Sequence, residues 1–263
     1  MVKRKRKLSV PTPAVFILSL AVSAWAADGF RGDHRDAWGP RFEGGHDAPR
    51  HRATRRGDES TNWVRRWNEI ALDANALDHT PVAPGESRVF GEQLGPGRTS
   101  RAFAIVQIAV FDAVNAIAGG YKSYTGLRPA LDGTSMKAAI AQAAHDALVA
   151  LYPSQTENFD DLLAEDLHRI RDGREKRNGI HLGHEAATAI LELRANDGSE
   201  HDEPQVGVDY ITSNEPGRWR QDPVSEIPLA LGARWREVRP LVLTSAGQFR
   251  APPPPALNDP EYT

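Results

Sequence analysis

The stretch RAFAIVQIAVFDAVNAIAGGYKSY, residues 101–124, decides the fold of this chain. Nearly every residue from Ala102 to Ala118 is apolar. The polar exceptions are Gln107, Asp112 and Asn115. The run ends in a glycine pair at 119–120, and glycine tolerates the left-handed conformation that stops a helix. We therefore predict a central helix that is buried on all sides within an all-α core.

A membrane-spanning helix is the alternative interpretation of the same run. Such a span needs about 20 nearly uninterrupted apolar residues. The run is shorter, and Asp112 in its middle would cost roughly 2.5 to 3.5 kcal/mol in a bilayer. Both points favour a helix in the core of a soluble bundle.

An amphipathic helix is predicted before this run. From Asn62, apolar residues recur with the 3.6-residue period of a helix, and the charged residues fall mostly off that stripe. The apolar positions are Trp63, Trp67, Ile70, Ala71, Ala74 and Leu77. A connection rich in proline and glycine follows over 78–96, and Thr99 or Ser100 is expected to cap the central helix.

Three more helices are predicted downstream. The first covers 135–152 and is so rich in alanine that a neighbouring backbone can come close; the expected neighbour is the central helix. Ser154 and Glu157 fit a capping box that would begin a helix ending at Gly173. The fifth helix is predicted over about 178–194.

A proline-rich segment follows over 199–257. It predicts a long wrap around the helices, with one short helix and with Trp219 and Trp235 as anchors. The sequence Asn258-Asp259-Pro260 then has the pattern of a helix start. The expected architecture is a helical bundle of about five main helices followed by this wrapping segment.

The first 26 residues have the pattern of a bacterial-type signal peptide. Basic residues at 3–7 precede a short apolar core at 14–22, and Ala-Trp-Ala at 24–26 resembles a cleavage site. An uncleaved membrane anchor is the alternative, but the apolar run is shorter than a span. We therefore predict an exported protein, periplasmic or extracellular, with no membrane span after cleavage.

Residues 27–61 are predicted to be a disordered tether. Their Gly, Arg, Asp and His content shows no apolar period and offers too little surface to bury. Three histidines of this segment could bind a metal loosely, namely His34, His46 and His51. We interpret them as solvated residues of the tether. The expected domain organisation is a signal peptide over 1–26, the tether over 27–61 and a helical domain over 62–263.

Composition excludes several classes of site and partner. With 25% charged and 40% hydrophobic residues the chain is ordinary globular material, and without cysteine it can form neither a disulfide nor a thiolate metal site. Removing the leader takes away five basic residues and no acidic ones, so the remainder is more acidic than the formal net charge of −3. This balance argues against nucleic acid as a partner.

Six segments in order carry a resemblance to a known family. They are WNEIALDA (67–74), GRTSRAFAIVQIAVFDAVNAI (97–117), AAIAQAAHDALVALYP (138–153), LELRANDGS (191–199), PGRWRQDP (216–223) and RPLVLTSAGQFRAPPPPALNDPEY (239–262). As a set they resemble the amino-terminal half of the bacterial vanadium-dependent haloperoxidases, which belong with the PAP2-type acid phosphatases. The resemblance covers about residues 62–263. It implies an all-α fold and, in complete members, a site for vanadate or phosphate.

The chemistry of that family resides in its carboxy-terminal half. There a K-x6-RP segment, a PSGH segment and an R-x5-H segment supply the cations and histidines that bind the oxyanion. None of the three occurs in this chain. The nearest match is K-x5-RP at 122–129, which we interpret as a surface loop. We therefore expect a truncated member with no catalytic, cofactor-binding or metal-binding residue and no cofactor of its own.

Two other polar clusters are candidate sites. The first joins His181, His184 and Glu185; the second joins His145, Asp146 and Asp112. Two histidines on one helical face can bind zinc, but the first cluster reads H-E-x-x-T and lacks the second histidine of a zincin. The second cluster could be a buried acid–base pair, and buried structural polar groups are the favoured interpretation. The remaining polar residues of the central helix are interpreted as packing contacts.

Two functions of different class follow. The first is an exported vanadium-dependent haloperoxidase-like or phosphatase-like protein that needs its missing oxyanion-binding half for activity. The second is a non-enzymatic helical interaction domain or remnant. Either is expected to leave an apolar face uncovered, which would bind the missing half or a second copy of the chain.

Overall fold

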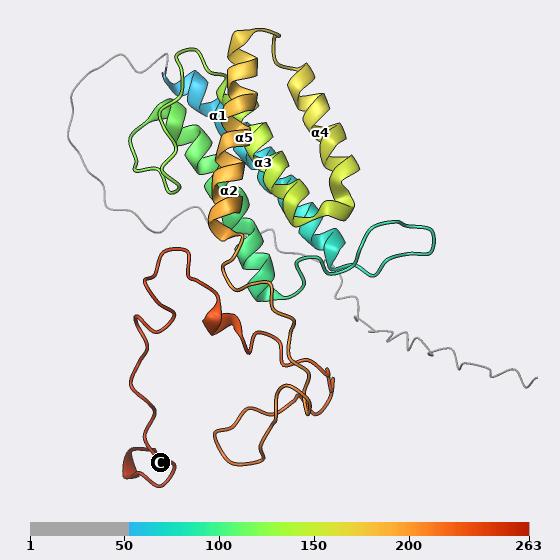
Figure 1. The fold of residues 1–263 in the computed structure, drawn as a ribbon, viewed down its shortest axis with the longest axis vertical. Coiled ribbons are helices and arrows are strands. Elements are labelled where there is room, and N and C mark those ends of the chain that lie inside the picture. The colour runs from blue at the N-terminus through green and yellow to red at the C-terminus, as the bar shows by residue number, and fades with distance from the viewer. Residues whose placement is uncertain (1–52, 263) are drawn as a thin grey trace, which may run out of the picture. The chain divides into compact units, whose positions relative to one another are not determined.

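The computed structural model describes residues 53–262, all within one compact unit of the chain. Five α-helices account for its regular structure: α1 Ala53–Asp78, α2 Pro96–Ala118, α3 Met136–Leu151, α4 Thr156–His168 and α5 Arg174–Arg194. Across the described range there is no β-strand, only isolated bridges in the segment after α5. The predicted all-α class with about five main helices is confirmed (Figure 1).

The helix at the centre of the bundle is α3, because it packs against each of the four other helices (Figure 1). Most of its residues are buried, and many of them are alanines. The prediction that α2 is buried on all sides is wrong. Phe111 on α2 is 38% exposed, and several neighbours are only partly buried. Since no other described helix covers this face, α2 is a flank of the bundle rather than its axis.

The small residues of α3 meet α5 at two glycines. A Cβ atom added to Gly179 would lie 2.4 Å from the carbonyl oxygen of Ser135, and one on Gly183 would lie 2.6 Å from that of Ala139. Both distances are far below van der Waals contact. The close approach predicted for the alanine-rich helix is therefore present, but its closest partner is α5 rather than α2.

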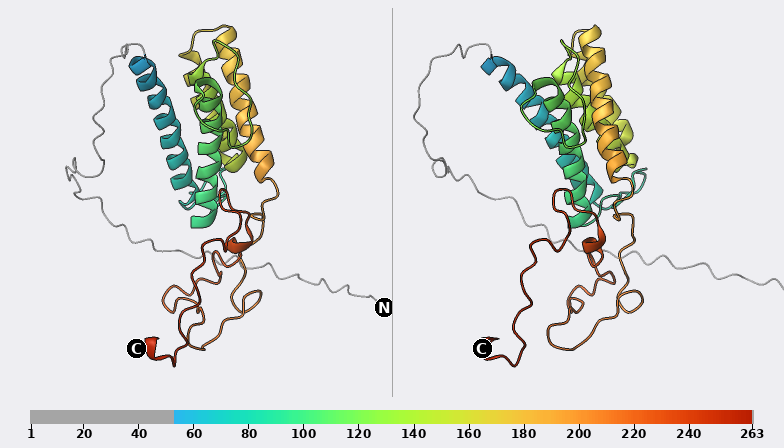
Figure 2. Two further views of the ribbon diagram at one scale, coloured as in Figure 1. Left: turned by 90° about the vertical axis from the view of Figure 1, so that its left-hand side faces the viewer. Right: turned by 60° about the vertical axis from the view of Figure 1, so that its left-hand side comes forward.

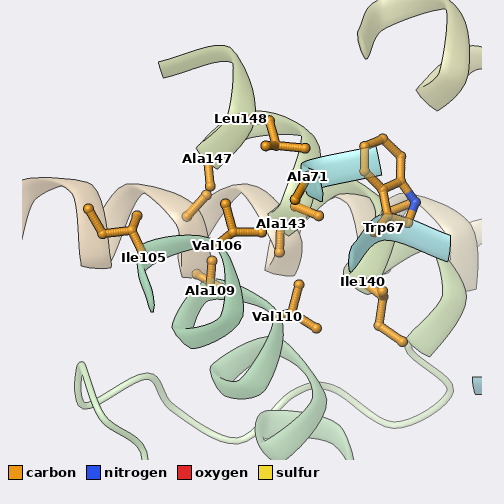
Figure 3. Packing of buried hydrophobic residues seen from close by; sticks show 14 of the residues in the cluster. Trp67, Ala71, Ile105, Val106, Ala109, Val110, Ile140, Ala143, Ala147 and Leu148 are labelled. Atoms are coloured by element: carbon orange, nitrogen blue, oxygen red, sulfur yellow. The ribbon is translucent and has the colours of Figure 1, made fainter. Parts of the chain in front are cut away.

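The main hydrophobic core surrounds α3 and includes residues of α5, and the part drawn in Figure 3 lies where α1, α2 and α3 meet. Trp67 of α1 is almost fully buried, and it packs among aliphatic side chains of the other two helices. The labelled neighbours include Ile105, Val106, Ala109, Val110, Ile140 and Leu148. The two views of Figure 2 place α1 and α5 on opposite sides of this core. The apolar stripe predicted for α1 thus faces the bundle.

The predicted N-caps of α2 and α4 are wrong, because the hydroxyl groups of the predicted capping residues bind other partners. Helix α2 begins at Pro96, earlier than expected, so Thr99 and Ser100 lie inside it. The Ser100 hydroxyl donates to the Pro96 carbonyl at 2.7 Å. Ser154 does not cap α4, since its hydroxyl donates to Oε2 of Glu92 at 2.7 Å. A single 3-10 turn, η1 Pro153–Gln155, leads into α4 instead.

Three helix limits also differ from the predictions. Helix α1 begins at Ala53 rather than near Asn62, so it includes the last part of the segment expected to be a tether. Helix α4 ends at His168 rather than at Gly173. Helix α5 begins at Arg174, directly after that glycine, rather than near residue 178. The predicted signal peptide and His34, His46 and His51 lie outside the described residues.

The segment after α5 has no α-helix within the described residues and contains two 3-10 turns, η2 Trp235–Glu237 and η3 Pro260–Tyr262. Trp235 packs against α2, since a Cβ on Gly97 would overlap its indole. Trp219 is 46% exposed, and its ring packs edge-on against Tyr210 of the same segment, with centroids 5.3 Å apart. The pattern at 258–260 produces only the short turn η3.

A buried ion pair fixes the start of this segment to the bundle. Oδ2 of Asp197 accepts from Nε of Arg101 at 2.8 Å, and Nη2 of Arg194 lies 2.5 Å from the same oxygen. Arg194 in turn donates to the carbonyl of Arg239 at 2.6 Å. Burial works to raise the pKa of Asp197, but its hydrogen bonds with Arg101 and Ser199 outweigh that effect and lower it. The carboxylate is therefore held in its charged form.

Among the described helices, α2 alone is long and apolar enough to cross a membrane. Half of its most apolar window is buried within the bundle. Its buried face includes Asp112 and Asn115, which bind the loop that follows the helix.

Candidate functional site

Two polar residues of α2 shape the loop over 119–135. Buried Asp112 accepts from the amide of Tyr124 and from the amide of Thr125, both at 2.8 Å. Asn115 exchanges two hydrogen bonds with the backbone of Tyr121. Gln107, the third polar residue of this helix, donates to Asn68 of α1 at 2.9 Å. These groups are packing contacts, as interpreted from the sequence.

A chain of alternating carboxylates and imidazoles links α3, α4 and α5. Nε2 of His145 lies 2.8 Å from Asp160 of α4, and its Nδ1 lies 2.7 Å from Oδ1 of Asp146. The other oxygen of Asp146 lies 2.8 Å from Nδ1 of His184 on α5. Gln142 donates to Asp146 at 2.7 Å. We call these five residues the histidine–aspartate chain.

The geometry of the histidine–aspartate chain makes His145 a cation. Both ring nitrogens face carboxylate oxygens, and an imidazole donates from both nitrogens only when it is protonated. Burial alone would lower the pKa of His145, but the hydrogen bonds to Asp146 and Asp160 raise it above its ordinary value. Burial would raise the pKa of Asp146, but the bonds from His145, His184 and Gln142 lower it. The interior of the chain is therefore an ion pair.

The exposed end of the chain is His184, whose side chain is 70% exposed. Because Asp146 holds its Nδ1, its Nε2 is the nitrogen left for other partners. A carboxylate-held imidazole can accept a proton, which is the base half of an acid–base pair. Asp112 does not take part, since both of its oxygens bind the 124–125 backbone. The pair suggested from the sequence is thus replaced by the histidine–aspartate chain.

A cleft of about 650 Å³ lies between the loop and the first half of α5. Its polar lining includes Arg128 from the loop and Arg177, Asn178, His181 and Glu185 from α5. Its apolar lining includes Leu127, Pro129, Ala130, Leu131 and Leu182. We call it the arginine cleft, and its volume is typical of small-molecule sites.

The arginine cleft contains only part of the K-x5-RP segment. Arg128 and Pro129 line it, whereas Lys122 does not. The histidine pair is also divided, because His181 lies 3.4 Å from Glu185 and His184 binds Asp146. Over residues 53–262, no group of three or more His, Cys, Asp or Glu is placed to hold a metal ion.

Sequence reasoning missed the partners that the fold supplies. Asp160 lies on α4 and was not singled out, and nothing local links it to His145. Arg177 and His181 are four residues apart on α5, so their common face was visible in the sequence. Their position opposite Arg128 was not, because it depends on how the loop crosses the bundle.

Comparisons with known proteins add no family. No protein-family description, curated protein or solved structure matches this chain.

Proposed function

We propose that this chain is the helical scaffold of an exported protein of the vanadium haloperoxidase type. In this proposal residues 62–263 supply a packing surface, and a separate segment supplies the lysine, arginines and histidines that bind vanadate or phosphate. The ordered set of six resembling segments carries the proposal. The first two lie within α1 and α2 and the third covers most of α3, and side chains of these helices form much of the shared core.

Exposed apolar side chains support the need for a partner segment. After α5 they include Ile211, Val224, Val242 and Phe249, which are 75%, 92%, 86% and 78% exposed. On the bundle, Phe111 and Tyr121 form an exposed aromatic pair with ring centroids 6.2 Å apart. Apolar surface of this kind is typical of a face that packs against another protein segment.

The coding sequence beyond the codon of Thr263 tests this proposal directly. We expect it to contain, in frame or shifted, a K-x6-RP segment followed by PSGH. Neighbouring coding sequence without these segments would contradict the proposal. Purified chain is further expected to show no bromination that depends on vanadate, bromide and peroxide. Vanadate-dependent bromination by residues 27–263 alone would refute the proposal that a separate segment binds the vanadate.

A non-enzymatic interaction domain is the second candidate, and the same exposed apolar side chains favour it. Here the partner is a second copy of the chain. Light scattering after gel filtration separates the two candidates, because self-association that strengthens with concentration supports the second. A monomer at all concentrations that still binds a hydrophobic dye supports a different partner and hence the first.

A further inference from the structure

We propose that the arginine cleft binds a small organic carboxylate with an apolar body. The cleft combines two arginines, an amide and aliphatic walls. This inference concerns the loop and α5, and it is independent of the proposed function.

The cations of the cleft are available to a ligand. Arg128 and Arg177 are exposed, and within residues 53–262 neither guanidinium has an ion-pair or hydrogen-bond partner. Arg101 differs, because its guanidinium is taken up by Asp197. A free guanidinium presents parallel N–H donors that match the two oxygens of a carboxylate. The two side chains come from different elements, the loop and α5, and line the same cleft.

The charge of the cleft favours a single negative charge on the ligand. Glu185 offsets one of the two arginines, and it lies 3.4 Å from His181. Two arginine cations and one glutamate anion, with histidine counted as neutral, give the lining a net charge of about one positive unit. A monoanionic carboxylate therefore balances it better than a doubly charged phosphate.

The walls of the cleft favour a hydrocarbon body. Leu131 is 73% exposed, and Leu127, Pro129 and Leu182 also line the space. Covering exposed aliphatic surface removes it from water and so stabilises the complex. An inorganic anion would leave these side chains uncovered.

The loop that carries Arg128 is held in place before any ligand arrives. Asp112 binds the 124–125 backbone, and the Ser123 hydroxyl accepts from the amide of Leu127 at 2.8 Å. The amide of Ala130 donates to the carbonyl of Ala116 at 2.8 Å. Since the loop is ordered by these bonds, binding loses little conformational entropy.

Titration of the full chain with hexanoate, followed by amide NMR shifts, tests the proposal. We expect saturable shifts in residues 127–134 and 177–185, with much weaker effects from acetate, hexan-1-ol and inorganic phosphate. Arg128→Gln and Arg177→Gln should each weaken hexanoate binding about tenfold, because each removes a charge-assisted hydrogen bond. Both side chains are exposed, so the fold should persist.

The matched control is Arg171→Gln, which removes an exposed arginine on the connection between α4 and α5. It should leave hexanoate binding within about twofold of the parent, as expected for a surface charge outside the contact. No saturable shift with hexanoate, or equal binding by the parent and both cleft variants, would overturn the proposal. Phosphate that binds as tightly as hexanoate would also overturn it, because the apolar walls would then have no role.

Discussion

Replacing His145 with glutamine should destabilise the protein in a manner that depends on pH. His145 is only 10% exposed, and it joins α3 to α4 through Asp160. The groups that face it are Asp146 on α3 and Asp160 on α4, while Gln142 and His184 reach it only through Asp146. Glutamine can keep one neutral hydrogen bond, but it removes the positive charge between the carboxylates.

The magnitude follows from how each carboxylate is exposed. The Asp146 side chain is 18% exposed, so its bond to a cationic imidazole falls in the range of roughly 1.5–3 kcal/mol for charged hydrogen bonds. Asp160 is 60% exposed, and such exposed ion pairs contribute roughly 0–1 kcal/mol. Allowing for the bond that glutamine retains, we expect His145→Gln to lower the free energy of unfolding by about 2 kcal/mol at pH 6.

The sign of the pH dependence follows from the raised pKa of His145. Its ordinary value is 6.5, so the charged bonds contribute fully below that pH and are lost as pH rises through the higher folded value. Asp146 has a lowered pKa, so its contribution is present above its ordinary value of 3.8 and is lost as pH falls through the folded value. The histidine–aspartate chain therefore contributes most to the stability of the protein between about pH 4 and 6.5.

Urea unfolding followed by circular dichroism, at intervals from pH 5 to pH 9, measures this effect. The difference between the parent and His145→Gln should shrink from about 2 kcal/mol at pH 6 to below about 1 kcal/mol at pH 9. The control is His168→Gln on α4, an exposed histidine whose imidazole makes no hydrogen bond among the described residues. A loss for His145→Gln that is equal at both pH values, or larger at pH 9, would refute the reasoning.

Two further substitutions test the packing between helices. Gly183→Ala should lower the melting temperature, with a loss of about 1–3 kcal/mol, because its new Cβ would lie 2.6 Å from the Ala139 carbonyl; helix propensity alone would favour alanine. Asp166→Asn should lower the urea midpoint, with a loss of about 2–3 kcal/mol, because the fully buried carboxylate accepts from Arg66 at 3.0 Å and from Trp67 at 3.1 Å.

Each of these substitutions has a matched control. Gly247→Ala introduces a Cβ with no atom within 4 Å, so its stability should stay close to that of the parent. Asp161→Asn removes an exposed carboxylate from the same helix as Asp166 and should change little. A Gly183→Ala variant as stable as the parent would mean that α3 and α5 can separate at no cost. An Asp166→Asn variant as stable as the parent would mean that the buried charge contributes nothing.

Much of the helical architecture could be predicted from periodicity, and the errors have a common physical cause. The stripe containing Trp67 correctly placed one face of α1 in the core. The capping patterns failed because a short-range rule competes with long-range partners: Ser154 binds Glu92, which lies far away in sequence. Helix α2 has more apolar side chains than the other helices of the bundle bury. Counting apolar residues therefore identified α2, instead of α3, as the central helix.

The candidate sites were less predictable than the helices because each one is assembled from distant segments. His145 and Asp146 were visible as neighbours, but Asp160 and His184 reach them only after α4 and α5 fold back. The pair of glycines in α5 was a local signal of close helix contact that spacing alone could have identified. The position of Arg128 depended on the loop path, which no periodicity encodes.

The central place of α3 has a consequence for synthesis on the ribosome. Two of its neighbours precede it and two follow it, so its alanine-rich surface cannot be fully covered until Arg194 has emerged. Until then the nascent chain has only α1 and α2 as partners for α3. We therefore expect nascent chains that end between Leu151 and Arg194 to be the stage most sensitive to protease and most in need of a chaperone.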